Sequence, residues 1–243
     1  MRYPGKMCMN TSAVSGNGKV ISVNETKVTG EDIKKDWIHR KFRVSESSHL
    51  IYGGKFMKKL LLVMGDLATG KSTFANILSK RYDANVFYKD SIKEVLGDNI
   101  GFSNREENLK LSRTTMELLL YIFKEFGKLD KDLILESNFH EEELERLHKM
   151  ASENGYQVFT LVLRGDVEIL HKRYLYRMKN ENRHPVHLST TLDVFDDFKS
   201  YAKRAREEKI PGKTVWINAD DFSYQTDKDI LAKIDEFMCA KGN

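Results

Sequence analysis

The clearest chemical signal in the sequence is a glycine-rich stretch between an apolar run and a helical pattern. It reads Gly65, Asp66, Leu67, Ala68, Thr69, Gly70, Lys71, Ser72, Thr73 and fits the pattern G-x-x-x-x-G-K-S/T. The two glycines allow the backbone to curl until successive N–H groups point inward, and the partial positive charge of a helix N-terminus adds to this nest. We therefore predict that residues 65–73 bind the phosphates of a nucleotide.

Three side chains of this stretch have different expected roles. Lys71 is expected to bridge the β- and γ-phosphates, and the Ser72 hydroxyl is expected to bind Mg²⁺. Asp66 is expected to point away from the nest, because polyphosphate repels a nearby carboxylate. The predicted cofactors are therefore ATP and Mg²⁺.

Two carboxylates follow later apolar runs. Asp90 comes nineteen residues after Lys71, at the carboxyl end of the run 84–89, which is the edge where open α/β sheets bind ligands. It is our candidate for the base that accepts the proton of an attacking hydroxyl, and the alternative is that it caps the next helix. Glu136 ends the run 132–137, where it either holds Mg²⁺ through water or pairs with a nearby Lys or Arg.

A basic segment between residues 164 and 187 supplies candidate cations. Arg173 and Arg177 are four residues apart and share one helix face. A guanidinium there can stabilise the charge of a phosphoryl group in transfer. Arg183 is the first choice for this contact and Arg177 the second, while a solvated basic helix is the alternative. We predict no metal site at His184 and His187, because no acidic residue accompanies them.

These residues must be positioned by a repeated strand and helix pattern. Short apolar runs at 58–64, 84–89, 132–137, 157–163 and 213–219 alternate with longer segments of helical period. Runs of this kind are typical of strands buried on both faces, so we predict a parallel sheet with helices on both sides. Ser103 and Glu106 are predicted to form a capping box at the start of one helix.

Composition separates two parts of the chain. Hydrophobic residues make up 40% and charged residues 31% of the 243 positions, which excludes collagen-like and wholly disordered classes. The net charge of +4 divides into +5 over residues 1–57 and −1 over the rest. We therefore predict a polar, basic tail or small appendage over residues 1–56, or a natural start at Met57, followed by one domain over 57–243.

The sequence also suggests where the protein acts. It has two cysteines, no apolar run long enough to span a membrane and no secretory signal, so we expect a cytoplasmic protein without membrane partners. A monomer or homodimer is expected.

With these motifs, residues 57–240 resemble the P-loop kinase family often labelled "AAA domain ATP-binding protein". The resemblance rests on Gly65 to Thr73, on Lys89-Asp90-Ser91, on Glu136-Ser-Asn-Phe, and on Arg173-x-x-x-Arg177 followed by Arg183-His184-Pro185. This group is similar to zeta toxins, chloramphenicol phosphotransferase, polynucleotide 5′-hydroxyl kinases and gluconate or shikimate kinases. The resemblance implies a three-layer α/β P-loop NTPase fold, a five-stranded parallel sheet in the order 2-3-1-4-5, and a mobile, helical lid that bears arginines.

Three functions remain open at this point. The leading hypothesis is an ATP-dependent kinase that moves the γ-phosphate to a hydroxyl of a small molecule, with Lys71, Asp90, Arg177 and Arg183 as catalytic residues. A kinase of nucleic-acid 5′-hydroxyl ends is the second hypothesis, which the near-neutral charge of residues 58–243 disfavours. The third is a regulatory or toxin-like nucleotide-binding module without small-molecule turnover.

Overall fold

The structure is a computed structural model that describes residues 57–188 and 192–239. The predictions of a basic tail or appendage over residues 1–56, and of a natural start after them, therefore fall outside the described residues and stay predictions.

Strands and helices alternate along the described chain. The strands are β1 (Lys58–Gly65), β2 (Asn85–Tyr88), β3 (Leu133–Glu136), β4 (Tyr156–Arg164) and β5 (Lys213–Asn218). The α-helices are α2 (Lys71–Tyr82), α3 (Lys89–Ile100), α4 (Arg105–Phe126), α5 (Glu141–Glu153), α6 (Val167–Asn180), α7 (Phe195–Glu207) and α8 (Lys228–Cys239). Two short 3-10 helices are η1 (Pro185–His187) and η2 (Ser223–Gln225). Each of the five predicted strands is present, with ends that differ from the prediction by no more than one residue.

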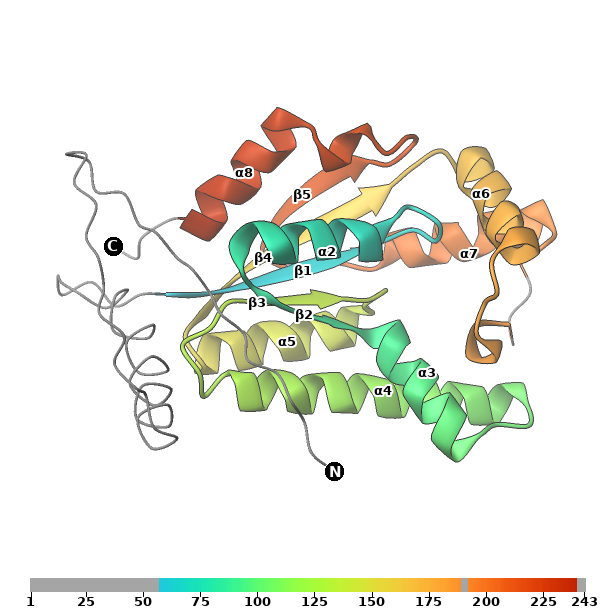
Figure 1. Ribbon diagram of the computed structural model, residues 1–243, viewed down its shortest axis with the longest axis horizontal. Coiled ribbons are helices and arrows are strands. Elements are labelled where there is room, and N and C mark those ends of the chain that lie inside the picture. Colours follow the sequence, from blue (N-terminus) through green and yellow to red (C-terminus); the bar gives the residue numbers. More distant parts are fainter. Residues whose placement is uncertain (1–56, 189–191, 240–243) are drawn as a thin grey trace, which may run out of the picture. The chain divides into compact units, whose positions relative to one another are not determined.

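The five strands form one parallel sheet in the order β2-β3-β1-β4-β5 (Figure 1). This confirms the three-layer α/β P-loop fold class and the strand order that the resemblance implied. β1 lies in the centre because it is apolar on both faces, and Leu60 to Met64 are at most 5% exposed. The carboxyl ends of all five strands therefore meet at one edge of the sheet.

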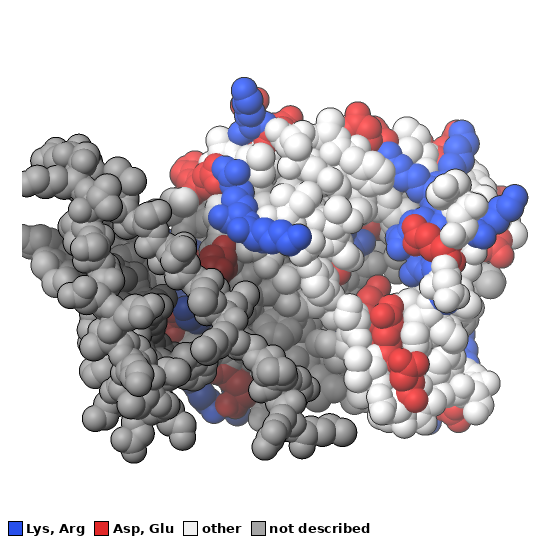
Figure 2. All heavy atoms as spheres, in the orientation of Figure 1, with Lys and Arg blue, Asp and Glu red and all other residues white. Residues whose placement is uncertain are grey.

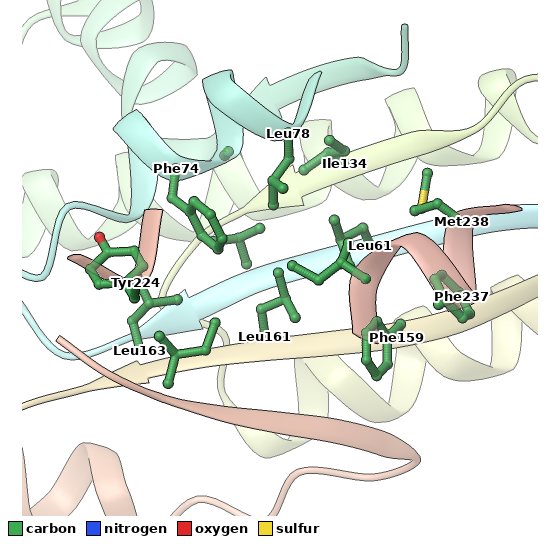
Figure 3. Packing of buried hydrophobic residues seen from close by; sticks show 14 of the residues in the cluster. Leu61, Phe74, Leu78, Ile134, Phe159, Leu161, Leu163, Tyr224, Phe237 and Met238 are labelled. Carbon is green, nitrogen blue, oxygen red and sulfur yellow. The ribbon is translucent and has the colours of Figure 1, made fainter. Parts of the chain in front are cut away.

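The strands bury alternate side chains on opposite faces. Leu61 and Val63 of β1 pack with Phe74 of α2 and Phe237 of α8 on one face (Figure 3). Their neighbours Leu60 and Leu62 join the cluster on the other face, which α4 and α5 cover (Figure 1). This period of two residues follows from the pleat of the strand.

A third cluster joins the glycine-rich loop to α6 and α7. Leu170 and Tyr174 of α6 and Phe198 of α7 pack with Ala68 of the loop, and Leu67 lies against them. The helix that bears Arg173 and Arg177 is thus packed directly on the loop that it was predicted to serve.

The start of α4 differs from the prediction by one residue. The helix begins at Arg105, and the side chain of Asn104 accepts a hydrogen bond from the Glu107 N–H at 3.0 Å. The Glu107 carboxylate in turn accepts from the Ser103 N–H at 2.6 Å. The predicted box of Ser103 with Glu106 is therefore wrong, because Asn caps as well as Ser and the same spacing recurs one residue later.

Candidate active site

The loop between β1 and α2 has the backbone conformation that its glycines predicted. Gly65 has φ 132° and Gly70 has φ 85°, both in the region that favours glycine. A Cβ atom at Gly65 would lie 2.0 Å from the carbonyl oxygen of Leu163 in β4, so a larger residue does not fit there. Ala68 also has a positive φ of 60°, which adds local strain to the loop.

Hydrogen bonds fix the loop from inside and from η2. The hydroxyl of Thr69 donates to the carbonyl oxygen of Asp66 at 2.8 Å, and the Tyr224 hydroxyl donates to the carbonyl oxygen of Thr69 at 2.7 Å. The Lys71 ammonium donates to the carbonyl oxygens of Asp66 at 2.7 Å and Gly65 at 3.2 Å. Lys71 is therefore folded over the loop, where its charge faces the predicted phosphate nest.

The side chain of Asp66 is held by α7. Its carboxylate is 3% exposed and pairs with the Arg206 guanidinium at 2.5 Å, and it also accepts from the Gly165 N–H at 3.3 Å. The hydrogen bond to Asp66 raises the pKa of Arg206. This ion pair explains how a carboxylate is accommodated in a phosphate-binding sequence, in line with the expectation that it points away from the nest. Sequence patterns gave no sign of Arg206.

Ser72 and Glu136 meet at the ends of α2 and β3. The Ser72 hydroxyl donates to a carboxylate oxygen of Glu136 at 3.0 Å. Burial raises the pKa of Glu136, Lys71 lowers it, and the charge of Asp90 raises it further. The alternative of a direct ion pair does not occur, since Glu136 has no Lys or Arg within ion-pair distance among the described residues. A hydroxyl and a carboxylate are both oxygen ligands of the kind that Mg²⁺ prefers.

Asp90 lies in the first turn of α3 and lines the same cleft. The charge of Asp90 raises the pKa values of Lys71 and Glu136. It also raises the pKa of Arg183, which other causes lower. The alternative role as a helix cap is not seen, because Tyr88 occupies the N-cap position and no side chain caps this helix. Asp90 therefore projects at the strand edge with its carboxylate available to a ligand.

The two arginines predicted to contact a transferring phosphoryl group lie on α6 and in the segment between α6 and η1. Arg177 donates to Glu181 at 3.0 Å and lines the cleft together with Arg183. Burial lowers the pKa of Arg183, and the neighbouring charge of Arg177 acts in the same direction. The two predicted arginines therefore lie close together, near Asp90.

Arg173 is held by the loop that follows β5. It donates to the carbonyl oxygen of Ala219 at 2.7 Å and to that of Asp220, and its guanidinium lies 4.4 Å from the centre of the Phe222 ring. Arg173 and Arg177 share a helix face, and of these two Arg177 was the one predicted to contact the phosphate. Unlike Arg173, Arg177 donates to a side chain, that of Glu181, and not to the loop that follows β5.

The segment that follows α6 is tied to α3. His184 contacts Asp98 at 2.9 Å, and His187 contacts Glu94 at 2.8 Å. These acidic partners come from a distant part of the sequence, so the expectation that no acidic residue accompanies the two histidines is wrong. Among the described residues, no group of three or more His, Cys, Asp or Glu side chains is placed to hold a metal ion.

Two buried polar residues, absent from the sequence predictions, strengthen this contact. Lys93 donates to Asn108 at 2.7 Å, and both side chains donate to the carbonyl oxygen of Val186 in η1, at 3.2 and 2.9 Å. Val186 packs so closely that a Cβ atom at Gly97 would lie 2.3 Å from it. No local pattern marks Lys93 or Asn108, because the role of each depends on the position of η1.

Together these elements surround a cleft of about 1070 Å³ at the carboxyl edge of the sheet. Residues 65–73, Asp90, Glu136, Arg177 and Arg183 all line it. Figure 2 shows Lys and Arg side chains gathered where α6 lies, beside a hollow in the surface. The structure thus brings every predicted site residue to one cleft.

Over residues 57–188 and 192–239, none of the helices combines the length and apolar character that crossing a bilayer requires.

Comparison with known proteins agrees with this geometry. A candidate kinase from Chloroflexus aurantiacus has a similar structure, with a TM-score of 0.65 and 23% identity over 74% of this chain and 98% of that chain. A sugar kinase from a Janibacter species gives a TM-score of 0.51 and 13% identity over 75% and 95% of the two chains. A comparison with curated proteins finds no match. At these identities the two structures establish the fold alone.

A family model supplies the closer assignment. The model described as "AAA domain" matches residues 61–192, which is more than half of the chain and includes the glycine-rich loop, Asp90, Glu136, Arg177 and Arg183. Its match, the strand order and the conformation of residues 65–73 agree with one another. The chain therefore belongs to this AAA domain family of nucleotide-binding P-loop proteins.

Proposed function

We propose that the chain is a Mg²⁺- and ATP-dependent phosphotransferase that moves the γ-phosphate to a hydroxyl of a small molecule. The observation that carries this proposal is the convergence of Lys71, Asp90 and the arginines 177 and 183 on one cleft. Phosphoryl transfer requires a cationic cradle, a base beside the acceptor and a means of excluding water. These residues supply the first two. The description of both similar structures as kinases agrees with this chemistry.

The residues present fit a magnesium ion bound with the nucleotide. The Ser72 hydroxyl and the Glu136 carboxylate are 3.0 Å apart and supply oxygen ligands, directly or through water. Mg²⁺ commonly takes only one or two protein ligands and completes its shell with phosphate oxygens and water. When bound, it would neutralise charge on the β- and γ-phosphates.

In the proposed reaction, Asp90 accepts the proton of the acceptor hydroxyl. The acceptor oxygen forms a bond to the γ-phosphorus as the bond from that phosphorus to the β,γ-bridging oxygen breaks, and ADP leaves. Lys71 turns from the carbonyl oxygens of Gly65 and Asp66 to the phosphates, a short movement for a flexible side chain. Its charge stabilises the negative charge that accumulates on the bridging oxygen.

The lid completes the site in this proposal. Arg183 and Arg177 neutralise the charge on the equatorial γ-phosphate oxygens, and the contact of η1 with α3 closes the cleft against water. Excluding water matters because a water molecule that reached the γ-phosphorus would turn transfer into hydrolysis.

A transfer assay tests the proposal. The full chain is incubated with Mg²⁺, ATP labelled on the γ-phosphate and a pool of small metabolites, and the labelled products are separated. A labelled small product supports the proposal. Label transferred instead to an added 5′-hydroxyl oligonucleotide would favour the nucleic-acid kinase, and tight ATP binding with no transfer to either would favour a regulatory module.

A further inference from the structure

The wall of the cleft formed by α3, α4 and α7 carries more positive than negative charge. We call it the helical wall. Its charged side chains are four cations and one carboxylate, namely Lys89, Lys93, Arg105, Arg204 and Asp90. None of these cations belongs to the glycine-rich loop or to the lid, so the nucleotide site proposed above does not use them.

Lys93 is the buried member of this group. The residue is 9% exposed, and its ammonium has two neutral hydrogen-bond acceptors, Asn108 and the carbonyl oxygen of Val186. No carboxylate lies within ion-pair distance of it among the described residues. Burial lowers the pKa of Lys93, as do Lys89 and Arg105, whereas Asp90 raises it. A buried cation without a carboxylate partner is costly unless an anion in the cleft complements it.

Arg204 brings a further positive charge from α7. Among residues 57–188 and 192–239 it has no hydrogen-bond or ion-pair partner, although it lines the cleft. Burial raises the pKa of the neighbouring Tyr201, Asp90 raises it too, and Arg204 lowers it. Arg204, Tyr201 and Asp90 all line this cleft.

A buried hydroxyl also lacks a partner at this cleft. Ser137 follows β3 and is 4% exposed, and its Oγ atom makes no hydrogen bond to the described residues. It lines the cleft beside Glu136. Buried hydroxyl groups are nearly always paired, so an unpaired one that lines a cleft indicates a polar ligand at this point.

We propose that the helical wall binds an anionic group, a carboxylate or a phosphate, on the small hydroxyl compound that accepts the γ-phosphate. This inference rests on the proposed function and names its substrate class. Arg204 and Lys93 bind the anionic group, Ser137 bonds to a polar group of the same compound, and Asp90 faces its reacting hydroxyl. The contacts of η1 with Lys93 and Asn108 restrict this side of the cleft, which favours a small molecule over a nucleic-acid strand.

Binding of simple anions to the nucleotide-loaded protein tests the proposal. The full chain is first saturated with Mg²⁺ and AMP-PNP, and this binding is measured by calorimetry. Inorganic phosphate and glycerate are then titrated separately into the loaded protein. We expect at least one of them to bind saturably, and we expect Arg204→Met to weaken that binding about tenfold to a hundredfold, as the loss of a charged hydrogen bond does. Lys93→Met should weaken it as well.

The matched control is Arg113→Met, because Arg113 lies on α4, is exposed and does not line the cleft. This variant should bind the anion as the wild type does. Preference for phosphate or for glycerate would identify the anionic group. The inference is overturned if neither anion binds, if Arg204→Met and Arg113→Met bind it equally, or if a short 5′-hydroxyl oligonucleotide displaces it more effectively than glycerate does. If AMP-PNP itself does not bind, the proposed function fails instead.

Discussion

The cleft has two sides that are built in different ways. The glycine-rich loop presents mainly backbone groups from nine consecutive residues, 65–73, and its conformation depends on Gly65 and Gly70. The helical wall presents side chains from α3 and α4 and from the distant α7, and Lys93 on it is held by its contacts with Asn108 and Val186. A site made of backbone can be predicted from a short motif, whereas a site made of distant side chains cannot. In the function proposed above, the first side binds the nucleotide and the second selects the acceptor.

One of the two largest effects is expected for Arg183, which lies between α6 and η1. Arg183→Gln should lower turnover about a thousandfold, because an arginine that neutralises a transferring phosphoryl group contributes on that order. Steady-state assays with the acceptor found by the transfer assay measure this. Arg173→Gln is the matched comparison, because Arg173 is anchored to Ala219 and contributes to packing. An equal loss in both variants would contradict the different roles given to them.

A substitution at Asp90 tests the side of the cleft that is proposed to face the acceptor. Asp90→Asn should lower turnover by about 10²–10⁴ while ATP binding remains, because an amide cannot accept the hydroxyl proton. The measurement compares kcat with the dissociation constant for AMP-PNP. Turnover preserved in this variant would refute the role of Asp90 as the base, and loss of nucleotide binding would mean that it serves the loop.

The ion pair between Arg206 of α7 and Asp66 of the loop should contribute to the free energy of unfolding. Arg206→Gln leaves the Asp66 carboxylate buried without its partner, which should lower the free energy of unfolding by about 3 kcal/mol, the scale seen when one member of a buried pair is removed. Denaturant unfolding measures the loss. The double variant Asp66→Asn with Arg206→Gln should recover most of it, and no recovery would show that Arg206 acts through packing alone.

A smaller effect of opposite sign is expected at Glu136. Because burial raises the pKa of Glu136, the folded protein binds this proton more readily than the unfolded chain does, so stability falls as the pH rises through the window between the two pKa values. Glu136→Gln should therefore melt a few degrees higher than the wild type at about pH 7, on the scale of about 1 kcal/mol. The difference should vanish near pH 3.5, below the ordinary pKa of about 4.3. A variant that melts lower at neutral pH would contradict this.

The sequence predicted the strands and the glycine-rich loop better than it predicted the contacts between residues far apart in the chain. The apolar runs located each strand of the described residues because burial on both faces leaves a continuous signal, and the motif at 65–73 located the loop. Arg206 could not be found, since its partner Asp66 lies 140 residues away. The start of α4 was misplaced because Asn104 and Ser103 offer the same capping chemistry in adjacent registers. Where two registers are equally good locally, tertiary packing decides between them.

The most direct test of the central claim is nucleotide binding by calorimetry with Mg²⁺ and AMP-PNP. The wild type should bind one equivalent, and Lys71→Met should bind at least about tenfold more weakly, since a charged contact to the phosphates is lost. The variant Lys80→Met is the control, because Lys80 is exposed on the same helix and does not line the cleft. Absence of binding in the wild type, or equal binding by Lys71→Met, would contradict a nucleotide site at residues 65–73.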